Sequence, residues 1–138
     1  MPSPNMPTLD TAIVYPGTVL FEGTNVSEGR GTTRPFELIA APWVVAESFA
    51  AALNRHHLEG VVFRPAVFEP TFHKYAKETC AGCQLHVTNR QTFHPVLAAV
   101  LLLEAFRSAG HERSAGVIRH MSTNTSNCRL KSLRDRQR

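Results

Sequence analysis

The sequence predicts a small α+β domain of α/β-like character, with a small mixed sheet and two main helices. Short β-prone runs alternate with stretches that have helical spacing. Hydrophobic residues make up 43% of the 138 residues and charged residues 19%, which suits a chain that buries a core. No apolar run approaches the roughly 20 residues of a membrane span, so none is expected.

The strand candidates are short runs rich in β-branched or aromatic residues. In the last of them Leu85 and Val87 face one way, while Gln84, His86 and Thr88 face the other. Pro16 and Gly17 predict a turn before the first run. The expected strands cover residues 18–21, 36–40, 61–64 with a continuation at 67–68 after Pro65, and 84–88.

Two longer segments predict helices. The first has Pro42 in its first turn and ends before Gly60, and the second runs from Pro95 to about Ser108 and stops at Gly110. Residues 8–13 suit a short helical turn capped by Thr8 or Asp10. The side chains expected to pack in the core from the two longer helices are Val45, Phe49, Ala52 and Leu53, then Leu97, Val100, Leu101 and Leu103.

The net charge of +4 is unevenly distributed along the chain. Residues 1–107 carry eight basic and nine acidic side chains, whereas residues 108–138 carry seven basic and two acidic ones. A basic segment of this kind is typical of a solvated tail, and no aromatic residues are interleaved to stack on bases. We therefore expect no nucleic-acid partner.

Three cysteines do not form an even disulfide framework. Cys80 and Cys83, followed by His86, resemble half of a zinc site, but no second pair stands at the usual spacing and Cys128 lies in the tail. Buried thiols are the expected outcome. We predict no metal and, because no coenzyme motif is visible, no cofactor.

The most informative segment is a glycine-rich loop at residues 23–33. Its glycines permit unusual backbone angles, and its polar groups can surround a ligand. Arg30 offers a planar fork for a carboxylate or phosphate. The loop has neither the dinucleotide fingerprint nor the lysine of a phosphate-binding loop. An ordinary tight connection, whose polar groups satisfy one another, is the structural alternative.

Longer motifs carry a family resemblance. The run Phe-Glu-Gly-Thr-Asn-Val-Ser-Glu-Gly-Arg-Gly-Thr-Thr-Arg-Pro-Phe at residues 21–36 resembles the exo-β-N-acetylmuramidase (NamZ) family of glycoside hydrolases. The resemblance extends over about residues 2–107. Its other segments are residues 2–8, 15–18, 41–43, 63–65, 68–72, 74–75, 80–82 and 84–88, followed by Phe93 and Pro95.

The resemblance implies a hydrolase that releases N-acetylmuramic acid from the non-reducing ends of peptidoglycan fragments, in cell-wall turnover and recycling. It also implies a two-domain enzyme, truncated here. Residues 1–34 would be a remnant of an N-terminal Rossmann-like domain and residues 35–109 an incomplete C-terminal α+β domain. Residues 110–138 would be a divergent, disordered basic tail. A missing N-terminal half is then the implied partner, and the chain alone is expected to be inactive.

Site residues follow from the loop and the resemblance together. Glycoside hydrolysis usually needs two carboxyl groups, and Glu22 is the candidate here, ahead of Glu28 and Glu37. An equal alternative is that Glu22 orders the loop, and the principal carboxylate is expected in the missing half. Arg30 suits the lactyl carboxylate of muramic acid. The other expected substrate-binding residues are Asn25, Ser27, Thr32, Tyr75 and His86, with His73 beside Tyr75 in a possible pocket wall.

Two rival functions stay open at this point. One is a non-catalytic carbohydrate-binding or inactive truncated product, and the other is a small zinc-binding module. Relatives that act on cell-wall material are often exported, yet no signal peptide is recognisable in the sequence, so the compartment is not predicted.

Overall fold

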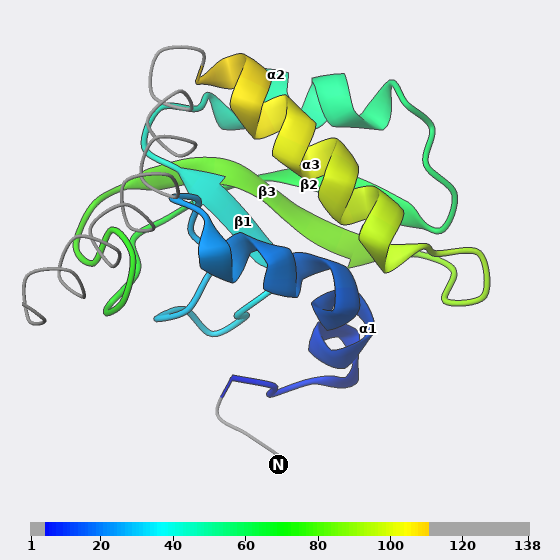
Figure 1. Ribbon diagram of the computed structural model, residues 1–138, viewed down its shortest axis with the longest axis horizontal. Helices are drawn as coiled ribbons and strands as arrows, with labels where there is room; N and C mark the ends of the chain where they lie inside the picture. Colours follow the sequence, from blue (N-terminus) through cyan, green and yellow to red (C-terminus); the bar gives the residue numbers. More distant parts are fainter. Residues whose placement is uncertain (1–4, 111–138) are drawn as a thin grey trace, which may run out of the picture.

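The computed structural model describes residues 5–110, which form three helices, a short 3-10 helix and one sheet (Figure 1). The elements in chain order are α1 (Leu9–Thr18), the 3-10 helix η1 (Val19–Gly23), β1 (Leu38–Ala41), α2 (Ala46–Asn54), β2 (Val61–Phe68), β3 (Cys80–Val87) and α3 (Pro95–Ala109). The α+β class predicted from the sequence is confirmed. The divergent basic tail predicted at residues 110–138 lies, from residue 111 onward, outside the described residues.

The sheet has the strand order β1-β3-β2, and both pairings are antiparallel, so the sheet is not mixed as predicted. Leu38 pairs with Gln84 at one end of β1, and Phe63 pairs with Leu85 in β2. The sequence predicts an interruption at Pro65, but β2 continues through this residue. It is tolerated because β2 is an edge strand, where a missing backbone donor is least costly.

The central strand β3 begins at Cys80, earlier than the predicted start at residue 84. Gly82 explains the extension, because a Cβ atom there would lie 2.2 Å from the Ile39 carbonyl oxygen. Only a glycine lets the β1 backbone approach β3 this closely. The predicted alternation is otherwise correct, since Leu85 is buried and His86 is exposed.

Residues 18–21 do not form the predicted strand. Thr8 caps α1 as expected, with its Oγ1 accepting a hydrogen bond from Thr11 N at 3.1 Å, but the helix continues through Pro16 to Thr18. Gly17 lies against the main chain of Pro95, so burial against α3 overrides the local turn and strand preferences. The predicted turn at Pro16 and Gly17 is likewise wrong.

The core lies between the sheet and the helices. Helix α2 packs on β2 and β3, and α3 packs against α1 and α2 (Figure 1). The Phe106 ring contacts the Phe49 ring at 4.4 Å and the Phe21 ring at 6.2 Å between centroids. Val14, Phe21 and Val26 thus share one core with residues beyond position 34. The domain boundary predicted at residue 34 stays a prediction.

Helix α3 buries a different face from the one expected. Leu97 and Val100 are 53% and 51% exposed, so their predicted core positions are wrong. In α2, likewise, Phe49 and Leu53 are buried but Val45 and Ala52 are exposed, and α2 begins after Pro42. The buried residues of α3 are Ala98, Ala99, Leu102 and Phe106.

Both edges of the sheet are partly covered. On β2, the Asn54 side chain donates to the Phe63 carbonyl at 2.8 Å and accepts from its N–H at 2.9 Å. On β1, Ser27 and Ala40 exchange backbone hydrogen bonds of 2.8 and 3.0 Å. These contacts occupy donors and acceptors that would otherwise be open to another strand. None of the helices in residues 5–110 is long and apolar enough to cross a membrane.

Candidate functional site

Two loops meet at the β1 side of the sheet. The first loop is residues 24–36, which lead into β1, and the second loop is residues 69–79, which join β2 to β3. Thr71 links them, because its N–H and its Oγ1 both donate to the Gly31 carbonyl, at 3.0 and 2.9 Å. The glycine-rich segment singled out in the sequence therefore has a specific partner, distant in the chain.

The second loop has an unusual backbone. His73, Tyr75 and Lys77 have φ values of 72°, 56° and 64°, in the left-handed region that non-glycine residues rarely occupy. Such conformations persist only where the surroundings impose them, and they concentrate at functional sites. Here the Tyr75 hydroxyl donates to the Asn25 carbonyl at 2.6 Å, which fixes the loop on its neighbour.

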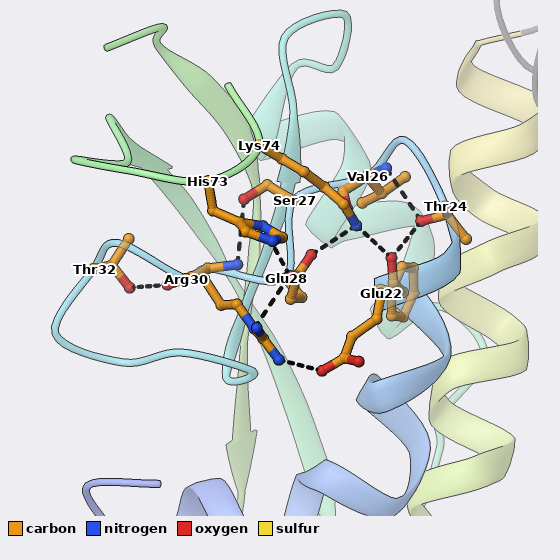
Figure 2. A network of polar contacts seen from close by, with 11 residues as sticks. Glu22, Thr24, Val26, Ser27, Glu28, Arg30, Thr32, His73 and Lys74 are labelled. Atoms are coloured by element: carbon orange, nitrogen blue, oxygen red, sulfur yellow. Dashed lines mark hydrogen bonds and ion pairs between the residues drawn. The ribbon is translucent and has the colours of Figure 1, made fainter. Parts of the chain in front are cut away.

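Glu28 is the centre of the polar cluster between the two loops (Figure 2). It is 0% exposed, and its Oε2 accepts a hydrogen bond of 2.8 Å from Lys74 Nζ. The same ammonium donates to the carbonyls of Phe21 at 2.7 Å and Val26 at 3.1 Å. All three donors of Lys74 are thereby used, so this lysine holds Glu28 and both loops together.

The other carboxylate oxygen of Glu28 is less well satisfied. Oε1 lies 3.3 Å from His73 Nδ1 and 3.5 Å from Arg30 Nε. Neither Glu28 Oε1 nor Arg30 Nε has a hydrogen-bond partner with acceptable geometry within the described residues, although both are buried. Buried polar atoms are usually paired, and exceptions are a feature of binding sites.

Arg30 is held on three sides. Its Nη2 contacts Glu22 Oε1 and its Nε faces Glu28 (Figure 2). Its guanidinium carbon lies 5.3 Å from the centre of the Phe36 ring. Phe36 is itself fixed by an edge-to-face contact with Tyr15 at 4.8 Å. The side chains of Arg30 and Glu22 remain 26% and 38% exposed, and that of His73 is 42% exposed, so these three residues form the accessible side of the cluster.

The side chains of Ser27 and Thr32 form hydrogen bonds within the first loop. Ser27 is buried and its Oγ accepts from Gly29 N at 3.3 Å, while Thr32 Oγ1 donates to the Gly29 carbonyl at 2.6 Å. Gly29 itself has a φ of 74° that allows the tight turn. These contacts match the structural alternative for the loop. The substrate-binding roles of Asn25, Ser27 and Thr32 stay predictions.

His86 does not join the cluster. The hydrogen bonds and ion pairs described above for the cluster do not include His86, which lies exposed on β3, two positions from Gln84, the partner of Leu38 in β1. Of the predicted site residues, Glu22 contacts Arg30 and Tyr75 contacts Asn25. A substrate role for His86 stays a prediction.

The two cysteines of β3 point to opposite faces of the sheet, since three positions separate them on a strand. Burial raises the pKa of the Cys80 thiol to about 11, with a smaller contribution from Glu78, and burial also raises the pKa of Cys83 well above its usual range. Thiolates are the form that binds metal. Within residues 5–110 no group of three or more potential ligands converges on one point.

A second buried carboxylate lies close to the first loop. Glu37 is 2% exposed; its Oε1 accepts from Thr8 Oγ1 at 2.9 Å and Thr11 Oγ1 at 2.7 Å, and its Oε2 accepts from Arg34 at 2.9 Å. The two threonine contacts of Glu37 tether α1 to the start of β1, and its contact with Arg34 holds the end of the first loop. We therefore assign Glu37 a structural role, although the sequence analysis also named it as a weaker catalytic candidate.

Sequence reasoning missed Lys74 as the central cation of the cluster. A lysine in a loop normally indicates a solvated charge, and nothing local reveals that a glutamate 46 residues away will be buried against it. The available signal was Lys74 and Tyr75 together, within the motifs that carry the family resemblance.

The fold and the cluster define an α+β lobe with a preformed charged site on one side. Residues 13–132 match the family model described as "Exo-beta-N-acetylmuramidase NamZ, C-terminal", which covers most of the chain. The chain therefore belongs to the family of the C-terminal region of NamZ.

Two relatives support the same assignment. The chain is 51% identical over 104 residues to the peptidoglycan β-N-acetylmuramidase NamZ of Bacillus subtilis (strain 168), which covers 75% of this chain and 25% of that protein. It is also similar to the crystal structure of a DUF1343 family protein from Bacteroides fragilis NCTC 9343, with a TM-score of 0.76 and 31% identity. That match covers 80% of this chain and 29% of the other. The chain thus spans about a quarter of the curated relative.

Proposed function

We propose that this chain supplies one wall of the substrate cleft of an exo-β-N-acetylmuramidase. The substrate is N-acetylmuramic acid at the non-reducing end of a peptidoglycan fragment. The observation that carries the proposal is the cluster in which Arg30, partly exposed, is held in place by Glu28 and the strained second loop. The named activity of the Bacillus subtilis relative supports it.

Arg30 is the group that would recognise the sugar. N-acetylmuramic acid differs from N-acetylglucosamine by a lactyl ether that carries a carboxylate, and a guanidinium fork binds a carboxylate with two parallel hydrogen bonds. Stacking over Phe36 and the contact with buried Glu28 restrict the side chain of Arg30. A preordered arginine loses little freedom on binding, which favours affinity.

Glu22 is the candidate catalytic carboxylate within this chain. It lies at the accessible side of the cluster, whereas Glu28 and Glu37 are buried and bonded to Lys74 and Arg34 respectively. Glycoside hydrolysis usually needs a second carboxyl group roughly 5 to 9.5 Å away. We assign the principal carboxylate to the part of the family architecture that this chain does not match, so catalysis requires that companion lobe.

A non-catalytic sugar-binding product is the second candidate. It is favoured by one observation, namely that the chain matches only 25% of the length of the relative whose activity is named. Both candidates require sugar binding at Arg30, and they differ only in turnover. The zinc-module alternative has no such support, since Cys80 and Cys83 point to opposite faces of β3.

Sugar binding is tested by calorimetric titration of the full chain with N-acetylmuramic acid and with N-acetylglucosamine. We expect N-acetylmuramic acid to bind more tightly, and Arg30→Ala to weaken its binding by about tenfold or more, as for a lost charged hydrogen bond. The matched control is Arg55→Ala, an exposed arginine at the end of α2. Equal binding of the two sugars, or an unaffected Arg30→Ala, would refute the assignment.

Turnover is tested in a chimera. The matching stretch of the Bacillus subtilis enzyme is replaced by that of this chain, and a chromogenic N-acetylmuramic acid glycoside is assayed. Activity that is lost again on Arg30→Ala supports a working cleft wall. An inactive chimera that folds and still binds the sugar points instead to the non-catalytic product.

A further inference from the structure

The partners of Arg30 differ in how easily they can leave. Glu28 is fully buried and tied to Lys74, and Phe36 is buried and locked against Tyr15. Glu22 contacts the guanidinium from the solvent side, on the short helix η1, through one carboxylate oxygen only. A single-oxygen contact uses less of the guanidinium fork than a carboxylate that binds it with both oxygens.

The charges of the cluster also favour Glu22 as the partner that can leave Arg30. The formal charges of the two carboxylates, Glu22 and Glu28, cancel those of Arg30 and Lys74. Withdrawal of Glu22 leaves one positive charge at Arg30, which a ligand carboxylate would neutralise. Withdrawal of Glu28 would instead leave the ammonium of Lys74 without its carboxylate partner, which is strongly unfavourable in the interior.

We propose that Glu22 is an exchangeable counter-ion, which occupies Arg30 in the unliganded protein and is displaced by the carboxylate of the incoming sugar acid. This inference rests on the proposed function and deepens it. The exchange sets affinity and specificity, since only an anionic sugar can replace Glu22 at the guanidinium. It also frees the Glu22 carboxylate, next to the bound sugar, for the catalytic part proposed above.

The test compares Glu22→Gln with the native chain in titrations with N-acetylmuramic acid, with lactate as the minimal carboxylate and with N-acetylglucosamine. Removing the competing charge lowers the Kd for the two carboxylates by about two- to fivefold, the range expected for a surface ion pair, and leaves N-acetylglucosamine unchanged. Glu22→Asp, with its carboxylate withdrawn by one methylene, shows a smaller decrease. Glu47→Gln, the same substitution at an exposed site on α2, changes none of the three.

The exchange is overturned if Glu22→Gln binds both carboxylates with unchanged or weaker affinity than the native chain. It is also overturned if neither protein binds them. Tighter binding of N-acetylglucosamine would overturn it as well, because the gain would then not depend on charge. The proposed function fails on a different result, namely N-acetylmuramic acid binding that survives Arg30→Ala. The double variant separates the two, since Arg30→Ala abolishes the gain caused by Glu22→Gln.

Discussion

At the scale of single residues, the site depends on a carboxylate in the protein interior, where carboxylates are rare. Glu28 is fully buried, and Lys74 is the partner that donates to it with good hydrogen-bond geometry. Desolvating two charges is costly, and it is offset only when the remaining donors are also satisfied. Lys74 meets that condition through the carbonyls of Phe21 and Val26.

We therefore predict that Lys74→Met lowers the free energy of unfolding by about 3 kcal/mol, because Glu28 is left buried without its hydrogen-bonded cation. Urea denaturation measures the change. The control is Arg90→Met, which breaks the exposed pair with Asp10 and should cost at most about 1 kcal/mol. Adding Glu28→Gln to Lys74→Met should recover part of the loss, and equal costs for the two single variants would contradict the prediction.

At the scale of elements, the placement of α1 depends on its contact with α3. Gly17 is the point of closest approach, since a Cβ atom there would lie 2.0 Å from the Pro95 carbonyl oxygen and 3.1 Å from the Ala99 side chain. Backbone atoms cannot move aside as a flexible side chain can. The helix α1 must therefore shift as a unit if any larger residue replaces the glycine, and Glu37 is bonded to the same helix through Thr8 and Thr11.

We predict that Gly17→Ala destabilises the protein by about 1–3 kcal/mol, the usual cost of overpacking, despite the better helix propensity of alanine. Gly23→Ala is the matched control, because a Cβ atom at Gly23 meets nothing within 4 Å and should change stability by no more than about 0.5 kcal/mol. Urea denaturation of both variants checks this. A neutral Gly17→Ala would mean that α1 is not held in this position.

At the scale of the whole molecule, one core extends across residue 34. Val14, Phe21 and Val26 are buried together with Phe49 and Phe106. The segment taken from the sequence as a remnant of another domain therefore packs with the residues that follow it. Elements that share a core usually open together.

We predict that the amides of α1 and β3 exchange hydrogen through the same global opening. Native-state hydrogen exchange at increasing denaturant concentration gives the opening free energy of each segment, with Val14 and Leu85 as reporters. Equal values within error are expected. An α1 that opens at several kcal/mol less than β3 would instead make residues 1–34 a separately unfolding unit.

The sequence analysis was most successful where a local signal is sufficient. The helix at Pro95, the cap at Thr8 and the alternation of Leu85 with His86 each follow from a few neighbouring residues, and each is confirmed. It was wrong where packing decides, as in the residues 18–21 that continue a helix. The predicted burial of Leu97 and Val100 was also wrong, because a run of apolar residues does not indicate which face of the helix packs against the core.

By itself, the sequence determined the α+β class and the family, because these depend on the pattern of strand and helix signals and on ordered motifs. It also predicted the loop that contains Arg30 as a candidate site. Only the tertiary structure decided that Glu28 is the buried centre of the site and that Lys74 and His73 reach it from a second loop. Burial and charge pairing between residues distant in the chain arise only when the loops are folded together, so no local pattern encodes them.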